Sequence, residues 1–221
     1  MTIKGIIFDF DGLIIDTESP DVTVWKEFYQ PYRLEFPMEE YSKQIGQVFN
    51  DTFPIEYLVR TLDLQMDGAT LYEQFKARRL SLIEEQPLRA GVLDYLQQAQ
   101  ARGLAIGLAS SSKASWVNHH IARENIQHYF QCIRTLEDVS HPKPDPELYV
   151  RTLECLGLQP HEAIAFEDSF NGIRAAKSAG MNAVAVPNPV TKIFDFSQAD
   201  LVLNELTETS LEKLIAYFES I

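Results

Sequence analysis

The chain has 221 residues, 45% of them hydrophobic, and its 32 acidic and 19 basic side chains give a formal net charge of −13. This apolar content supports a buried core, whereas the negative charge argues against binding to nucleic acid or to anionic membranes. No apolar run approaches the ~20 residues of a membrane-spanning helix, and no signal-peptide pattern precedes the first apolar run. We therefore expect a globular, cytoplasmic protein.

The two cysteines, Cys132 and Cys155, do not form a C-x-x-C pair. Isolated cysteines usually behave as small apolar side chains of the core. Disulfides are also rare in the reducing cytosol, although a single bridge between these two residues is possible. We therefore expect two reduced cysteines that are buried in the core.

The first apolar run covers residues 3–10, and its length and β-branched side chains predict a buried strand. The next clear strand–helix repeat begins only after residue 87, which is far beyond an ordinary strand–helix connection. The intervening stretch has helical patterns at residues 22–29, 57–62 and 70–85, and no clear strand. We expect residues 16–87 to form an inserted all-α cap domain.

Strand-like and helix-like patterns alternate after the insertion. Further strands are predicted at residues 104–110, 132–135, 163–166 and 182–186. Helices are predicted at residues 91–102, 114–124, 146–156, 169–179 and 211–220. This alternation is typical of a parallel sheet with helices on both faces. The predicted fold is α/β, a doubly wound parallel sheet with a Rossmann-like core made of residues 1–15 and 88–221.

Two acidic residues end the first strand. Asp9 and Asp11 are two positions apart, so their carboxylates point toward one site. A divalent cation between them would relieve their repulsion, and magnesium prefers carboxylate and carbonyl oxygens. Two solvated acids are the simpler alternative, but Asp9 interrupts a run that should be buried.

Hydroxyl groups and a lysine follow the next strands. Ser110, Ser111 and Ser112 stand before a predicted helix, where hydroxyls and free amides can hold a phosphate. For Ser112 we favour ordinary helix capping. Lys143 lies between two prolines in a stiff loop, and an ordinary solvated lysine is the alternative there.

Glu167 and Asp168 follow the strand at residues 163–166, where two acids again suit a metal ion. Asp168 could instead cap the following helix. The carboxyl ends of parallel strands form the ligand-binding edge of such a sheet, so all four groups are expected at that edge. Solvated side chains and helix caps could explain each group separately. They do not explain why two acids, serines, a lysine and two further acids follow the strands in this order.

In this order of motifs the sequence resembles the haloacid dehalogenase superfamily. FDFDGLIIDTE at residues 8–18 resembles its first motif and LASSS at residues 108–112 its second. The lysine of KPDPE, Lys143, resembles its third, and FEDS at residues 166–169 its fourth. The resemblance covers the whole chain and is strongest to β-phosphoglucomutases and small sugar-phosphate phosphatases.

The resemblance implies a phosphate-transferring enzyme. It assigns Asp9 as the nucleophile that forms an aspartyl phosphate, and Asp11 as the acid and then the base. It implies that Ser110 and Lys143 hold the phosphoryl oxygens. The cofactor implied is Mg²⁺, and its expected ligands are Asp9, Asp11 through its carbonyl, Asp168, and Glu167 directly or through water.

Substrate contacts are expected from Ser111, Thr17 and Gln47, the last within a candidate specificity loop at residues 46–49. An ordinary interhelix turn is the alternative for that loop. The expected partner is a small phosphorylated metabolite, bound by a monomer.

Three competing functions are weighed against a phosphatase. β-Phosphoglucomutases carry a histidine soon after the first motif and an arginine in the cap loop, and neither occurs here at residues 19–21 or 47–50. Dehalogenases need no magnesium and lack the second aspartate, so Asp11 and Asp168 argue against that class. A non-catalytic scaffold is disfavoured because every expected catalytic position is filled. We therefore expect hydrolysis of phosphate monoesters, with a phosphomutase as the alternative.

Overall fold

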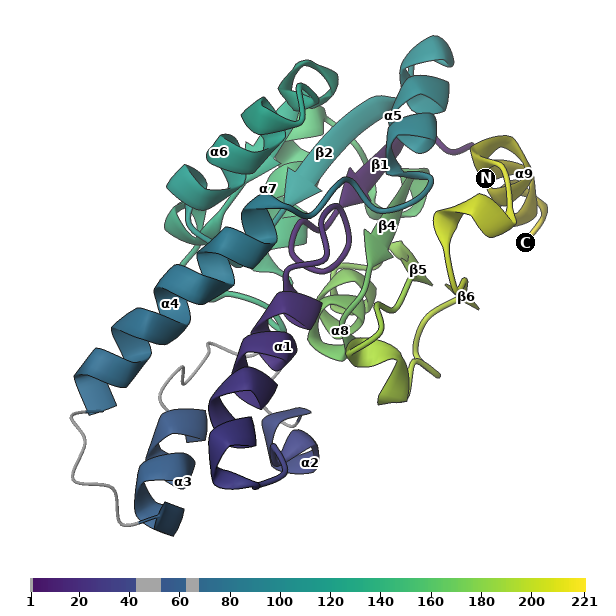
Figure 1. Ribbon diagram of the computed structural model, residues 1–221. Helices are drawn as coiled ribbons and strands as arrows, with labels where there is room; N and C mark the ends of the chain where they lie inside the picture. Colours follow the sequence, from purple (N-terminus) through teal and green to yellow (C-terminus); the bar gives the residue numbers. More distant parts are fainter. Residues whose placement is uncertain (1, 43–52, 63–67) are drawn as a thin grey trace.

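The computed structural model describes residues 2–42, 53–62 and 68–221 (Figure 1). Gln47 and the loop predicted at residues 46–49 lie outside these residues. Within the described ranges, no helix is both long enough and apolar enough to cross a membrane.

The described residues form one six-stranded sheet in the order β3-β2-β1-β4-β5-β6, with every neighbouring pair parallel. Its strands are β1 (Gly5–Phe8), β2 (Ala105–Ala109), β3 (Cys132–Arg134), β4 (Ala163–Glu167), β5 (Asn182–Ala185) and β6 (Leu201–Val202). The first five strands confirm the sequence prediction. β1 is central, between β2 and β4, so the acids that follow it lie in the middle of the carboxyl edge.

Helices cover both faces of this sheet, as expected for a doubly wound fold. They are α5 (Val92–Ala101), α6 (Ala114–Arg123), α7 (Glu147–Leu156), α8 (Phe170–Ser178) and α9 (Leu211–Ser220). Successive side chains of β1 point to opposite faces of the sheet. Ile6 and Phe8 pack with α5, α6 and α9, whereas Ile7 packs with α7 and α8. Short 3-10 helices occupy Gln30–Tyr32, Gln127–Tyr129, Leu136–Asp138, Pro160–Glu162, Thr191–Ile193 and Leu206–Glu208.

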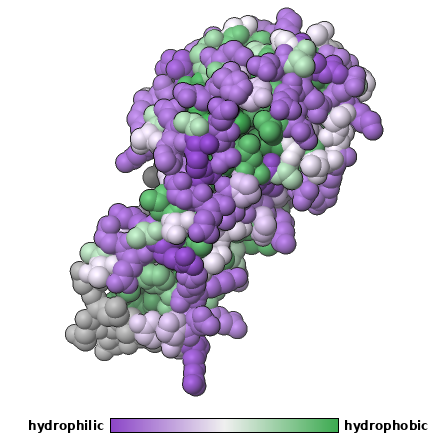
Figure 2. All heavy atoms as spheres, turned by 45° about the horizontal axis from the view of Figure 1, so that its top comes forward, coloured by the Kyte–Doolittle hydropathy of each residue, from purple (hydrophilic) through white to green (hydrophobic). Residues whose placement is uncertain are grey.

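The long stretch after β1 is helical. Its helices are α1 (Glu18–Tyr29), α2 (Met38–Ser42), α3 (Phe53–Leu62) and α4 (Gly68–Glu84). They have their own apolar cluster, in which Trp25 of α1 stacks on Phe75 of α4 with ring centroids 3.8 Å apart. Figure 1 shows these helices on one side of the sheet and both chain ends on the opposite side. Figure 2 shows the same division as a larger and a smaller lobe, each with a largely hydrophilic surface.

The expectation of two reduced cysteines buried in the core is wrong in this structure, where Cys132 is buried and Cys155 is exposed. Cys132 of β3 and Cys155 of α7 form a disulfide. Helix α7 packs on β2 and β3, which brings the two Cα atoms to 6.2 Å, within the range that a disulfide spans. Residues 23 positions apart become neighbours only through this packing, which the sequence does not show.

Candidate active site

A buried lysine stands at the centre of the candidate site. The Lys143 ammonium donates to Asp9 Oδ1 at 2.5 Å, to Glu167 Oε1 at 2.6 Å and to the Ala109 carbonyl at 2.7 Å. Its side chain is only 6% exposed, so it is not the solvated lysine of the simpler interpretation. The loop that carries it is anchored because the Lys143 backbone N–H donates to the Ser111 hydroxyl at 3.3 Å. Residues from β1, β2, β4 and the loop before α7 thus meet at one point, as expected for a carboxyl edge.

Glu167 is fully buried at the end of β4 and accepts several hydrogen bonds. Besides Lys143, its Oε1 accepts from the Tyr149 hydroxyl at 2.7 Å, and its Oε2 accepts from the Ser169 hydroxyl at 3.1 Å. Tyr149, on α7, is a site residue that the sequence analysis did not identify. In the sequence it stands among apolar residues of a predicted helix, and nothing in that pattern indicates that its hydroxyl lies at the site.

Asp168 does not cap the following helix. Ser169 is the N-cap of α8, and its hydroxyl accepts from the Gly172 N–H at 3.0 Å. Asp168 instead accepts from Asn188 Nδ2 at 2.6 Å, and both side chains are buried. The Asn188 carbonyl oxygen Oδ1 accepts from the backbone N–H groups of residues 190 and 191, which leaves only the amide nitrogen to face the carboxylate.

Asn188 is a second site residue that the sequence patterns did not identify. It follows β5 in the stretch VPNPV, a polar residue between two prolines at the carboxyl end of a strand. The reasoning that singled out Lys143 therefore applies to it equally. Space around it is tight, because a Cβ added at Gly12, which has φ +74°, would lie 2.1 Å from Asp168 Oδ2.

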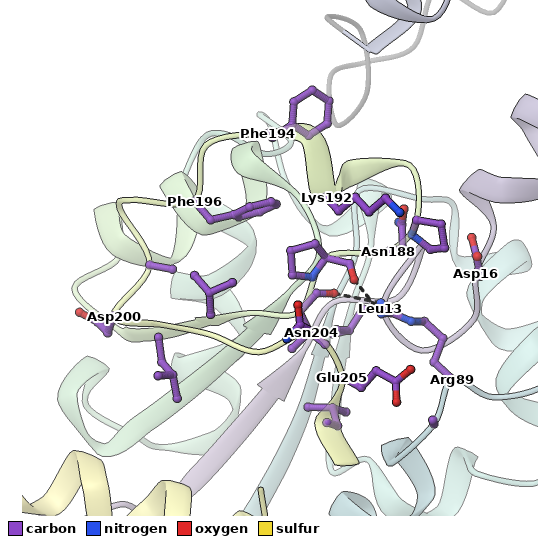
Figure 3. Close-up of a pocket in the computed structure, with 18 of the residues that line it drawn as sticks. Leu13, Asp16, Arg89, Asn188, Lys192, Phe194, Phe196, Asp200, Asn204 and Glu205 are labelled. Atoms are coloured by element: carbon purple, nitrogen blue, oxygen red, sulfur yellow. Dashed lines mark hydrogen bonds between the residues drawn. The ribbon is translucent and has the colours of Figure 1, made fainter. Parts of the chain in front are cut away.

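A cavity of ≈ 860 Å³ lies behind this loop, between the connections that follow β1 and β5. Figure 3 shows Arg89 reaching into it toward the loop of Asn188. The Arg89 guanidinium donates to the carbonyl oxygens of Gly12, Val186 and Pro187. Arg89 thus ties the loop after β1 to the loop after β5, and these loops carry the groups that surround Asp168.

Asp11 lies beside the start of α6. Its Oδ2 accepts from the Ser112 hydroxyl at 2.5 Å, and its Oδ1 accepts from the Trp116 indole N–H at 2.9 Å. The interpretation of Ser112 as a helix cap is therefore wrong, and the N-cap of α6 is Lys113, without a side-chain cap bond. The Ser112 hydroxyl turns to Asp11 because the loop after β1 passes directly beside it. Ser110, which is buried, has its hydroxyl 3.5 Å from Asp11 Oδ2.

Negative charge exceeds positive charge at this point. Carboxylate oxygens of Asp9, Glu167 and Asp168 all lie within 4.8 Å of one another, and all three residues are buried. Burial and the Glu167 charge raise the pKa of Asp9 to about 8. Burial and the Asp9 charge raise the pKa of Asp168 well above its ordinary value. Burial alone would lower the pKa of Lys143, but its two carboxylate partners outweigh this and raise it, so the ammonium stays charged.

This charge pattern fits a divalent cation. Lys143 is ion-paired with two of these three carboxylates, those of Asp9 and Glu167, so the cluster keeps a net negative charge when all three are ionised. Oxygen ligands and this charge deficit suit Mg²⁺. The chemistry of the donor set therefore matches the magnesium expected from the sequence.

A cleft of ≈ 970 Å³ opens above these groups, between the sheet and helices α1 and α4. Asp9, Ser110, Lys143 and Asp168 line its floor, and Tyr72, Phe75, Lys76 and Arg79 of α4 line the opposite wall. Thr17 also lines the cleft, and its buried hydroxyl has no hydrogen-bond partner among the described residues. The structure thus brings the predicted residues together, except Gln47, which lies outside the described ranges.

Comparison with known proteins agrees with this geometry. The sequence pattern of the haloacid dehalogenase-like hydrolases matches residues 6–186. YhcW of Bacillus subtilis (strain 168) is 39% identical over 218 residues, which are 99% of each chain. Fructose-1-phosphate phosphatase YqaB of Escherichia coli (strain K12) is 31% identical over 187 residues, which are 82% of this chain and 95% of YqaB. The crystal structure of CbbY from Rhodobacter sphaeroides in complex with phosphate, 27% identical, superposes with a TM-score of 0.73 over 96% of this chain and 99% of CbbY. Because the matched stretch contains all four motif positions, the chain belongs to the haloacid dehalogenase-like hydrolases.

Proposed function

We propose that this protein is a Mg²⁺-dependent phosphatase that hydrolyses small phosphate monoesters, sugar phosphates among them, through an aspartyl phosphate on Asp9. The observation that carries the proposal is the placement of Asp9, a buried carboxylate on the cleft floor with one oxygen held by Lys143. The names of relatives such as fructose-1-phosphate phosphatase support a sugar-phosphate substrate.

The proposed chemistry has two steps. Because Lys143 holds Oδ1 of Asp9, we assign Oδ2 as the oxygen that attacks phosphorus. An Asp9–phosphorus bond forms as the bond to the leaving oxygen breaks, and Asp11 supplies the proton that this oxygen needs. Water then attacks phosphorus, Asp11 takes its proton, and inorganic phosphate leaves with Asp9 restored. Holding both carboxyl groups two residues apart makes each step effectively intramolecular.

Ser110 and Lys143 are proposed to hold the phosphoryl oxygens. Magnesium, when bound by Asp9, Asp168 and the Asp11 carbonyl, neutralises charge on the transferring phosphoryl group. Glu167 is assigned a supporting role, through Lys143 or a bridging water, because its oxygens already accept from a lysine, a tyrosine and a serine.

Residues 16–87 are proposed as the cap that excludes water and contacts the leaving group. Two contacts support these bounds. Ile15 pairs with Leu88, which brings both connections to the sheet side by side. Arg123 of α6 donates to the carbonyl oxygens of residues 83, 84 and 86, which anchors the end of α4 to the core.

Hydrolysis is favoured over phosphomutase activity by the cap wall. A mutase must grip a sugar so that water stays away from the aspartyl phosphate. Asp21 stands in the stretch where mutases carry a histidine, and it is buried and ion-paired with Arg79 of α4. The charge of Arg79 is therefore already compensated by Asp21.

We expect the protein with Mg²⁺ to release inorganic phosphate from fructose 1-phosphate and from β-glucose 1-phosphate supplemented with a trace of glucose 1,6-bisphosphate. EDTA should stop the release, and added Mg²⁺ should restore it. Calcium should restore little because it prefers more ligands in a looser geometry. Phosphate and glucose 6-phosphate are measured in the same samples. Rapid formation of glucose 6-phosphate with negligible phosphate would assign the protein to the mutases instead.

Asn188 is expected to set the affinity for the metal. Asn188→Ala removes the buried N–H that orients Asp168, and loss of such a supporting bond weakens metal binding by about 10- to 100-fold. Isothermal titration with Mg²⁺ in the absence of substrate measures the dissociation constant. Asn204→Ala is the matched control, because this exposed asparagine lines the same cavity behind the loop. Equal dissociation constants for wild type and Asn188→Ala would contradict the assignment.

A further inference from the structure

The Asp11 carboxylate is held at both oxygens by residues of one short segment. Oδ2 meets the Ser112 hydroxyl at 2.5 Å and Oδ1 meets the Trp116 indole N–H at 2.9 Å. Ser112 immediately precedes the cap residue of α6 and Trp116 lies in its first turn. Neither contact follows from the sequence motifs, and Trp116 has no role in the mechanism described above.

The two contacts are chemically different. An indole N–H can only donate a hydrogen bond, whereas a hydroxyl can donate or accept. Oδ1 of Asp11 must therefore be an acceptor whenever the Trp116 bond is formed. A proton on Asp11 is then favoured on Oδ2, because an oxygen that carries the proton is the weaker acceptor. Ser110, on the cleft floor, is near this same oxygen, at 3.5 Å.

Trp116 is itself held between the core and the cap. It is half-buried and lines the cleft, and the Arg79 guanidinium of α4 lies 5.5 Å from its ring centroid. Arg79 is in turn ion-paired with Asp21 of α1. The ring therefore has a cation on one side and is hydrogen-bonded through its edge to Asp11, which defines the direction of its N–H.

We propose that Trp116 is a positioning residue that directs the acidic proton of Asp11 to Oδ2, the oxygen from which it is delivered to the leaving group. As the phosphorus–oxygen bond breaks, the proton passes from Oδ2 to the departing oxygen, and Asp11 becomes a carboxylate with Oδ1 still bonded to Trp116. Attack by water returns one proton to Oδ2. The inference rests on the proposed phosphatase function and deepens it, because it makes Trp116 matter most for esters with strongly basic leaving groups.

The test compares two esters that differ in their need for an acid. The alkoxide that leaves from fructose 1-phosphate must be protonated, whereas p-nitrophenyl phosphate releases an aryl oxide that is stable without a proton. Trp116→Phe keeps an aromatic ring beneath Arg79 and removes the N–H. We expect kcat/KM for fructose 1-phosphate to fall by about 10- to 100-fold, the effect of losing a hydrogen bond to a charged group. The value for p-nitrophenyl phosphate should be nearly unchanged.

A double-mutant comparison shows whether Trp116 acts through Asp11. In an Asp11→Ala background, Trp116→Phe should cause no further loss with either ester. Ser115→Ala is the control, because this exposed serine of α6 lines the same cleft. Thermal melting verifies folding, and Trp116→Leu replaces Trp116→Phe if the latter does not fold.

Equal losses on both esters, or a full additional loss without Asp11, would show a merely structural role and overturn the inference. An unchanged rate with fructose 1-phosphate would overturn it as well. A wild-type protein that hydrolyses p-nitrophenyl phosphate and fructose 1-phosphate keeps the proposed function whatever the variants show. A wild-type protein that hydrolyses neither ester overturns both.

Discussion

Asp9→Asn is expected to lower kcat for phosphate-ester hydrolysis by on the order of 10⁶-fold, the effect of removing a covalent nucleophile elsewhere. The amide is nearly isosteric and can still accept the Lys143 hydrogen bond, but it cannot form an acyl phosphate. Phosphate release is measured with a purified variant whose mass has been verified. Wild-type turnover by that variant would rule out Asp9 as the nucleophile.

The same variant should not be less stable than the wild type in EDTA. The pKa of Asp9 is raised from 3.8 to about 8 by burial and by Glu167, so its charged form disfavours the fold. A raised pKa means that the wild type without metal loses stability as the pH rises through this window, from 3.8 toward about 8. Asp9→Asn cannot ionise and should lose less stability over the same range. Urea denaturation at several pH values measures the difference, and a variant that unfolds first at pH 8 would contradict the charge argument.

Lys143→Met is expected to be the most destabilising of the substitutions considered. It leaves Asp9 and Glu167 buried without their shared cation, and removal of one partner from a buried ion pair costs about 3–5 kcal/mol. Activity should be lost as well, because the position of Asp9 depends on this lysine. The free energy of unfolding is measured by urea denaturation in EDTA.

Lys177→Met provides the matched comparison. Lys177 is ion-paired with Asp200, but these side chains are 33% and 28% exposed, so the pair is screened by solvent. Loss of such a surface pair costs less than about 1 kcal/mol. If both lysine variants lowered the free energy of unfolding by similar amounts, the buried ion pairs of Lys143 would not stabilise the fold more than a surface pair does.

Local sequence signals were sufficient for most of the framework. Apolar runs between helical patterns predicted β1 to β5, and an abnormally long helical stretch predicted the insertion after β1. Among the described residues, the strand β6 with two residues and the α-helix α2 with five escaped prediction, as did the short 3-10 helices. Segments this short do not complete enough periods of a strand or helix pattern to be recognised.

The sequence by itself determined which residues gather at the site, because strands of a parallel sheet present their carboxyl ends at one edge. Asp9, Ser110, Lys143 and Asp168 each follow a strand, so their meeting required only the fold class. The partners of individual side chains were decided by tertiary structure alone. Trp116 reaches Asp11 across 105 positions and Asn188 reaches Asp168 across 20, through the packing of whole elements. Hydrogen bonds of this kind depend on distances and directions set by that packing, and a local pattern contains no information about them.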